Sequence, residues 1–152
     1  VVAGIPKEWA GCMAPTYPVS VMIVQGTHDP LVPYAGGAIQ VGKKKRGDIL
    51  STDEAVEKWR QHNACQAPKE SHPIADQDPD DGCTATRIVY PGGRQGSVVE
   101  LWRIDGGGHT WPGGDQYLPK KVIGPVCRDF DASEEIWKFF SRTAPRPLPQ
   151  AD

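Results

Sequence analysis

The chain has few of the features that mark membrane proteins or nucleic-acid-binding proteins. Among its 152 residues the longest apolar run, residues 19–24, is far shorter than the roughly 20 residues needed to cross a bilayer. Its 17 basic and 19 acidic residues leave a net charge of −2, which provides no electrostatic drive toward nucleic acid or an anionic membrane. We therefore expect neither nucleic acid nor a membrane among its partners.

Cysteine is also scarce, and its spacing argues against a zinc site. The four cysteines, at positions 12, 65, 83 and 127, contain no Cys-x-x-Cys pair, so we expect no metal. Cys65 and Cys83 flank one polar loop, which a disulfide would tie down for about 3 kcal/mol on the chain-entropy model. We predict this disulfide and, with it, a secreted protein. Four reduced cysteines packed as small apolar residues are the alternative, and the pairing of Cys12 and Cys127 stays open.

The apolar pattern predicts an α/β fold with at least three strands. Residues 19–24 are almost continuously apolar and rich in β-branched side chains, which is typical of a strand buried on both faces of a parallel sheet. The β-rich runs 84–90 and 97–104 flank a six-residue turn and predict a hairpin. Glycines at 36–37 and the basic run 43–47 indicate loops.

Two helices begin at recognisable capping residues. Ser51 and Glu54 form a capping box for a helix extending to about His62. A second capped start at Asp131 opens a helix near the end of the chain. That helix carries an apolar stripe of Ile136, Trp137, Phe139 and Phe140.

The chain length favours a single domain, with less regular structure in two places. Residues 1–143 are predicted to form the domain, and the prolines of residues 144–152 predict an irregular tail. Residues 63–82 are polar and rich in proline, so we expect no regular element there. Within them, residues 76–82 place carboxylates alternately, as calcium loops do. Pro79 interrupts that pattern and the usual glutamate is missing, so we expect a solvated acidic loop.

Two loops carry residues that point to a chemistry. Asp29 lies in the segment 26–30, directly after the first strand, and His109 lies in the segment 106–112, after the last. An acid and then a histidine, each after a strand, is the order in which α/β-hydrolases present the last two members of a catalytic triad. Imidazole can take up and return a proton near neutral pH. The alternatives are an ordinary Asp-Pro turn at Asp29 and a structural histidine at His109.

The first member of such a triad, the nucleophile, is missing. None of the six serines lies in a Gly-x-Ser-x-Gly elbow. We expect the serine and the oxyanion-hole donors to come from outside this chain, and we predict that the chain alone is inactive. A remote alternative is that Ser97 or Ser133 acts as the nucleophile.

Three blocks of the sequence occur in the same order in a known family. They are residues 18–37 (PVSVMIVQGTHDPLVPYAGG), 107–114 (GGHTWPGG) and 131–140 (DASEEIWKFF). With them the chain resembles the C-terminal half of the polyhydroxybutyrate depolymerase and feruloyl esterase group of α/β-hydrolases. The resemblance implies a partial α/β-hydrolase sheet with flanking helices and a hairpin. It also implies hydrolysis of a polyester or hydroxycinnamate ester through an acyl-serine, without a cofactor.

The resemblance also implies roles for individual residues. Asp29 and His109 become the triad acid and base, while His28 beside the acid is a loop residue. Trp111 and Tyr34 are candidates for contact with the substrate. A structural role is an equal alternative for Trp111 and the favoured one for Tyr34. A sheet cut beside the nucleophile strand exposes an edge, so we expect the N-terminal half of the hydrolase, or a second copy, as partner. A non-catalytic binding or assembly module derived from a hydrolase is the alternative function.

Overall fold

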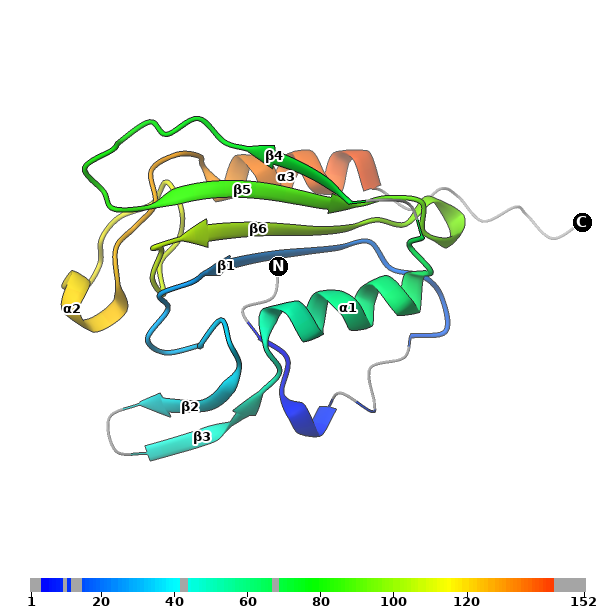
Figure 1. Ribbon diagram of the computed structural model, residues 1–152, viewed down its shortest axis with the longest axis horizontal. Helices are drawn as coiled ribbons and strands as arrows, with labels where there is room; N and C mark the ends of the chain where they lie inside the picture. The colour runs from blue at the N-terminus through cyan, green and yellow to red at the C-terminus, as the bar shows by residue number, and fades with distance from the viewer. Residues whose placement is uncertain (1–3, 10, 12–14, 42–43, 67–68, 144–152) are drawn as a thin grey trace, which may run out of the picture.

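The computed structural model describes residues 4–9, 11, 15–41, 44–66 and 69–143, and its centre is a four-stranded mixed sheet (Figure 1). The order of the strands is β1-β6-β5-β4. Their bounds are β1 Val21–Gly26, β4 Glu70–Pro73, β5 Thr84–Tyr90 and β6 Val99–Asp105. The mixed α/β architecture is compatible with a partial α/β fold. The predicted tail, residues 144–152, and Cys12 lie outside the described residues.

The two strands that precede the candidate loops lie side by side. β1 pairs with β6 in parallel, in a register that runs from Val21 opposite Val99 to Gly26 opposite Ile104. β5 pairs antiparallel with both β6 and β4, so the predicted hairpin of β5 and β6 is confirmed. The sheet is therefore mixed, because β1 and β6 are parallel whereas β5 is antiparallel to both of its neighbours. The burial predicted for the first strand is confirmed, since five of the six residues of β1 are buried.

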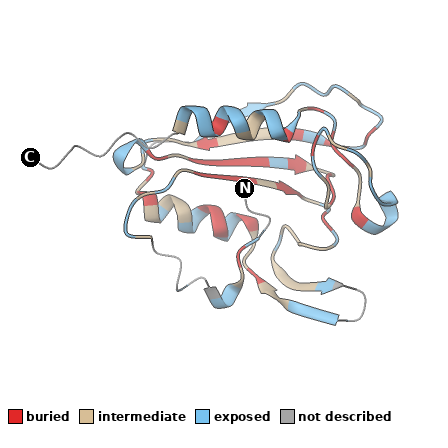
Figure 2. Ribbon diagram, turned by 180° about the vertical axis from the view of Figure 1, so that it is seen from behind, coloured by how far each residue is buried: buried red, intermediate tan, exposed pale blue. Residues whose placement is uncertain are grey.

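One helix covers each face of the sheet. The alternation along β6 turns Val99 and Leu101 toward α1 (Thr52–Asn63) and Trp102 toward α3 (Ala132–Thr143). Figure 2 shows both strands of the parallel pair largely buried between the two helices. The short helices are η1 (Lys7–Trp9), η2 (Arg94–Gly96) and α2 (Lys120–Ile123). None of the helices in the described part of the chain is long and apolar enough to cross a membrane.

Both helices begin where predicted, but the predicted apolar stripe on α3 is only partly buried. The capping box of α1 is present, with Ser51 Oγ accepting from Glu54 N and Glu54 Oε2 accepting from Ser51 N. Asp131 caps α3 by accepting from two amides of its first turn. Of the four residues of the predicted stripe on α3 only Phe139 is buried, whereas Trp137 is 72% exposed and Phe140 is 54% exposed.

Three segments predicted to be irregular contain ordered structure. The loops expected around residues 36–37 and 43–47 are largely an antiparallel hairpin of β2 (Gly37–Val41) and β3 (Lys44–Ile49). β4 lies within the segment 63–82 and is exposed along its length. β3 and β4 are polar and β2 is short, so no extended alternation of apolar residues predicted these strands. The acidic loop is not wholly solvated either, because Asp81 is buried.

The predicted disulfide between Cys65 and Cys83 is wrong. Cys65, Cys83 and Cys127 are all free thiols in this structure, and Cys65 and Cys83 lie in different core clusters. Cys65 packs with Val99 and Leu101 on the α1 face. Cys83 packs with Ile104 and Cys127 on the opposite face. The polar loop between the two cysteines passes from one face of the sheet to the other, so its two ends do not meet.

Candidate active site

The two candidate loops meet at one edge of the sheet. β1 ends at Gly26 and β6 ends at Asp105, and because these strands are parallel their carboxyl ends lie together (Figure 1). Asp29 follows β1 by three residues and His109 follows β6 by four. This edge is where open α/β sheets commonly bind their ligands.

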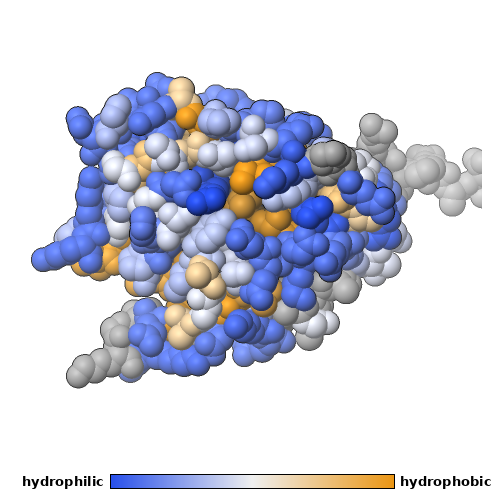
Figure 3. Space-filling view, in the orientation of Figure 1, coloured by the Kyte–Doolittle hydropathy of each residue, from blue (hydrophilic) through white to orange (hydrophobic). Residues whose placement is uncertain are grey.

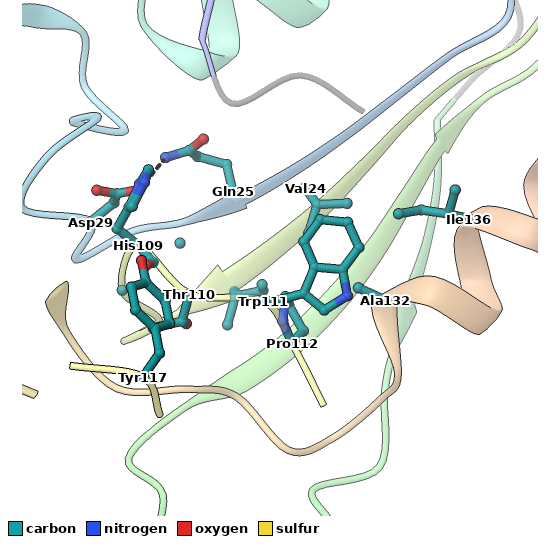
Figure 4. A pocket seen from close by; sticks show the side chains of 13 residues that line it. Val24, Gln25, Asp29, His109, Thr110, Trp111, Pro112, Tyr117, Ala132 and Ile136 are labelled. Carbon is teal, nitrogen blue, oxygen red and sulfur yellow. Dashed lines mark hydrogen bonds and ion pairs between the residues drawn. The ribbon is translucent and has the colours of Figure 1, made fainter. Parts of the chain in front are cut away.

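The structure brings the predicted acid and base into contact. His109 Nδ1 lies 2.9 Å from Asp29 Oδ2, and Figure 4 shows the two side chains facing each other. Asp29 Oδ1 accepts hydrogen bonds of 2.8 Å from the amides of both Leu31 and Val32. Gln25 Nε2 donates to Asp29 Oδ2 over 3.3 Å. These donors hold the carboxylate in one orientation toward the imidazole.

Burial differs sharply between the two partners. The Asp29 side chain is 5% exposed, whereas the His109 side chain is 35% exposed. An ionised carboxylate only accepts hydrogen bonds, so the pair assigns the ring proton to Nδ1 of His109. That tautomer leaves the lone pair on Nε2, which is the nitrogen that a general base uses.

Glycines allow the two loops to approach this closely. A Cβ on Gly26 would lie 2.2 Å from the carbonyl oxygen of Gly107, and a Cβ on Gly106 would lie 2.2 Å from that of Gly82. Gly106 also has a φ of +83°, which favours glycine. The amide of His28 donates to Gly107 O over 3.0 Å. These glycines are therefore required by the close approach of the backbones, while His28 itself is an exposed loop residue, as predicted.

An apolar cavity of about 250 Å³ opens beside His109. Figure 4 shows Trp111 near Val24, Ala132 and Ile136, on the side of the cavity away from Asp29. Trp111 is 48% exposed, and its Nε1 donates to Ser133 Oγ over 3.1 Å. Trp111 therefore lies where the prediction of a substrate contact requires it.

Tyr34, the other predicted substrate contact, lies elsewhere and does not line this cavity. Its hydroxyl donates to Asp53 Oδ1 over 3.1 Å, and the guanidinium of Arg103 lies 5.9 Å from its ring centroid. Burial and the negative charge of Asp53 raise the pKa of Tyr34 above its ordinary value. The side chain thus joins the loop after β1 to the start of α1 and has a structural role.

Two residues of the site were missed by the sequence reasoning. Gln25 is buried at the end of β1 and donates to both Asp29 and the carbonyl of Val32. Its only signal in the sequence is a polar side chain inside an apolar strand. Tyr117 lines the cavity, and its hydroxyl donates to the carbonyl oxygen of His109 over 3.1 Å. No local pattern distinguishes Tyr117 from an ordinary surface tyrosine.

No serine is among the described residues that line the cavity. Ser97 is buried just before β6, at the opposite end of that strand from His109. Ser133 lies nearer, on the first turn of α3, where it accepts from Trp111. The described residues therefore present an acid and a base without a nucleophile between them.

Comparison with known proteins gives one informative similarity. No family model matches the chain, and no solved structure matches it significantly. The chain is 28% identical over 133 residues to a protein of Nocardia uniformis subsp. tsuyamanensis named "Putative esterase NocK". The alignment covers 82% of this chain but 38% of that protein, so the chain spans well under half the length of its curated relative.

Proposed function

We propose that this chain supplies the acid and the base of a serine carboxylic-ester hydrolase whose nucleophile and oxyanion hole lie on residues outside it. The observation that carries the proposal is the 2.9 Å contact between Asp29 Oδ2 and His109 Nδ1 at the ends of adjacent parallel strands. The esterase name of the relative supports the same chemistry. The finer assignment, to polyhydroxybutyrate depolymerases and feruloyl esterases, rests on the resemblance of the sequence blocks around these residues.

In this proposal His109 moves one proton back and forth. Its Nε2 accepts the proton of a serine hydroxyl while the serine oxygen attacks the ester carbonyl. Asp29 stabilises the resulting imidazolium without taking the proton itself. The imidazolium then gives the proton to the departing alcohol, and water releases the acyl group by the same route. None of these steps requires a metal or an organic cofactor.

The cavity favours an ester with an apolar group next to the carbonyl. Val24, Ile104 and Ile136 contribute aliphatic walls, and Trp111 contributes an aromatic one. A volume of about 250 Å³ exceeds the roughly 150 Å³ of a cavity that takes benzene. An aromatic acyl group or a short hydroxyalkanoate unit therefore suits the site, which corresponds to the two ester classes of the proposal.

The proposed partner is the N-terminal half of the same kind of hydrolase. Among the described strands, β1 lies at the edge of the sheet and pairs only with β6. Figure 3 shows apolar residues gathered over these two strands on a face that is otherwise largely hydrophilic. More than half of the curated relative lies outside the aligned region and is long enough to supply such a half. A strand added along β1 would bring its own carboxyl end, and a nucleophile on it, to the edge that holds His109.

A reconstitution experiment tests the proposal. The chain would be mixed with the N-terminal half of a related esterase that carries a Gly-x-Ser-x-Gly elbow, and p-nitrophenyl acetate turnover would be measured. We expect turnover in the mixture, loss of turnover with His109→Ala, and little change with His28→Ala, an exposed histidine of the neighbouring loop. A fluorophosphonate probe should label the serine of the added half. Labelling of a serine in this chain, or turnover that survives His109→Ala, would contradict the proposal.

Light scattering separates the two kinds of partner. We expect a 1:1 complex in the mixture at micromolar concentration. Dimers of this chain that persist when the N-terminal half is added would identify self-association instead. A monomer in both samples would reject the proposed partner.

A binding or assembly module is the second candidate function. Trp111 and Trp137 are 48% and 72% exposed, and exposed tryptophans can bind polymers. Binding of the chain to insoluble polyester or arabinoxylan, unchanged by His109→Ala and without turnover in the reconstituted mixture, would favour this function.

A further inference from the structure

Two cysteines and two aspartates form a buried cluster on the α3 side of the sheet. Cys83 and Cys127 are 4% and 1% exposed and belong to the same core cluster. Asp81 and Asp129 are also buried. The Sγ atom of Cys127 and one carboxylate oxygen from each aspartate lie within 4.8 Å of one another. The cluster lies outside the residues that line the cavity beside His109.

Asp81 holds the backbones of the two cysteine segments together. Its Oδ1 accepts from the amide of Cys83 over 2.6 Å, and its Oδ2 accepts from the amide of Arg128 over 2.7 Å. One carboxylate thus bridges position 83 and the residue directly after Cys127. A disulfide needs Cα atoms about 4.4–6.8 Å apart. The shared carboxylate and the common core cluster bring the two cysteine segments side by side, as such a bond requires.

We propose that Cys83 and Cys127 form a structural disulfide when the protein folds under oxidising conditions. The sulfur–sulfur bond forms at the expense of the two S–H bonds, with loss of two protons and two electrons. A low-molecular-weight disulfide such as oxidised glutathione is the oxidant, and it is reduced to two thiols. The link joins the start of β5 to the segment before α3 and closes a loop that contains β6 and His109.

The segment around Cys127 supports the loop of the candidate base. The carbonyl of Cys127 accepts from the amide of Gly113 over 2.8 Å. The carbonyl of Pro125 accepts from the amide of Gly108 and from the hydroxyl of Thr110, each over 3.0 Å. A covalent link at Cys127 would therefore restrain the loop on both sides of His109. This consequence for catalysis rests on the proposed function, whereas the link itself does not.

The surroundings of the thiols indicate when the bond must form. Burial and the carboxylate of Asp81 raise the pKa of the Cys83 thiol to about 12. Burial, together with the charges of Asp129 and Asp81, raises the pKa of Cys127 to about 12. Only thiolates exchange with disulfides, so both cysteines react slowly once the protein is folded. We expect oxidation during folding, in a compartment that permits disulfides, which agrees with the expected secretion.

Peptide mapping without reduction tests the link directly. The chain would be refolded with a mixture of reduced and oxidised glutathione and then unfolded in denaturant that contains iodoacetamide, which alkylates the free thiols. It would then be digested and analysed by mass spectrometry. We expect one peptide pair joined through Cys83 and Cys127, with Cys65 alkylated. A link from Cys83 to Cys65 or Cys12, or alkylation of both Cys83 and Cys127, would overturn the proposal. So would zinc bound at Asp81, Cys127 and Asp129 in elemental analysis of the reduced protein.

Thermal melts supply a second measurement that does not depend on activity. The refolded chain should melt on the order of 10 °C higher than the same chain reduced with dithiothreitol after unfolding. Cys83→Ser and Cys127→Ser should each abolish this difference, and Cys65→Ser, the matched control, should keep it. A difference that persists in Cys83→Ser would contradict the link even if reconstituted activity were normal.

Discussion

Asp29 and Glu100 are both buried carboxylates that accept hydrogen bonds from basic side chains, but their partners differ. Glu100, on β6, is 1% exposed and accepts from Arg87 through Nε over 3.0 Å and through Nη2 over 2.8 Å. Arg142 of α3 donates to the same carboxylate. Asp29 instead pairs with the imidazole of His109, beside an open cavity.

The difference lies in what each partner can do with a proton. Guanidinium groups stay protonated at any ordinary pH, so the Glu100 cluster can only hold β5, β6 and α3 together. Imidazole has a second nitrogen, and in His109 the first is engaged by Asp29. Under the proposed function, two carboxylates of similar burial therefore serve stability in one place and support proton transfer by a histidine in the other.

Asp29→Asn should have the largest effect, and on activity alone. The asparagine oxygen can still accept from the amides of Leu31 and Val32, but its NH₂ group would face His109 Nδ1 and favour the wrong tautomer. Turnover of the reconstituted enzyme should fall by about 10⁴, as in the serine proteases. Urea denaturation should show a change in the free energy of unfolding below about 1 kcal/mol. Turnover within tenfold of the unsubstituted protein would show that Asp29 is not the triad acid.

Glu100→Gln should affect mainly stability. The substitution leaves Arg87 and Arg142 without their counterion, and breaking a buried ion pair costs about 3 kcal/mol. Urea denaturation of the isolated chain should show this loss. In the reconstituted enzyme, at a temperature where both proteins are folded, turnover should stay within a few-fold. A large loss of turnover with unchanged stability would reverse the roles assigned to the two carboxylates.

The stability contributed by Glu100 should disappear in acid. Burial alone would raise the pKa of Glu100, but hydrogen bonds from Arg87 and Arg142 lower it below its ordinary value of 4.5. A depressed pKa in the folded state gives stability that is present above about pH 4.5 and lost as the pH falls through the folded value. Melting temperatures between about pH 3 and pH 6 should fall less steeply in Glu100→Gln. Identical slopes would show that Glu100 is not linked to folding in this range.

Arg87→Lys should give the smallest effect and tests the geometry of the Glu100 cluster. Lysine keeps the charge but loses the two parallel hydrogen bonds of the guanidinium. We expect a loss of about 1 kcal/mol in the free energy of unfolding, clearly smaller than for Glu100→Gln. A loss as large as that of Glu100→Gln would mean that the paired hydrogen bonds, and not the charge, dominate the cluster.

Predictions from the sequence held where the signal was local. The capping box at Ser51 involves residues three apart, and the hairpin of β5 and β6 follows from two β-rich runs with one turn between them. The hairpin of β2 and β3 was not predicted because β3 is polar and its first three residues are exposed. The predicted pairing of Cys65 with Cys83 is wrong because these two residues, although near in sequence, lie on opposite faces of the sheet.

The candidate site shows the same division. The sequence specified an acid after one strand and a histidine after another, with glycines beside each, because these features lie within a few neighbouring residues. Only the tertiary structure places Asp29 Oδ2 2.9 Å from His109 Nδ1, eighty residues later in the chain. It also places Gln25 and Tyr117 in the site and Tyr34 outside it. The parallel register of β1 and β6 and the packing of helices on each face decide these contacts, and both depend on residues far apart in the chain.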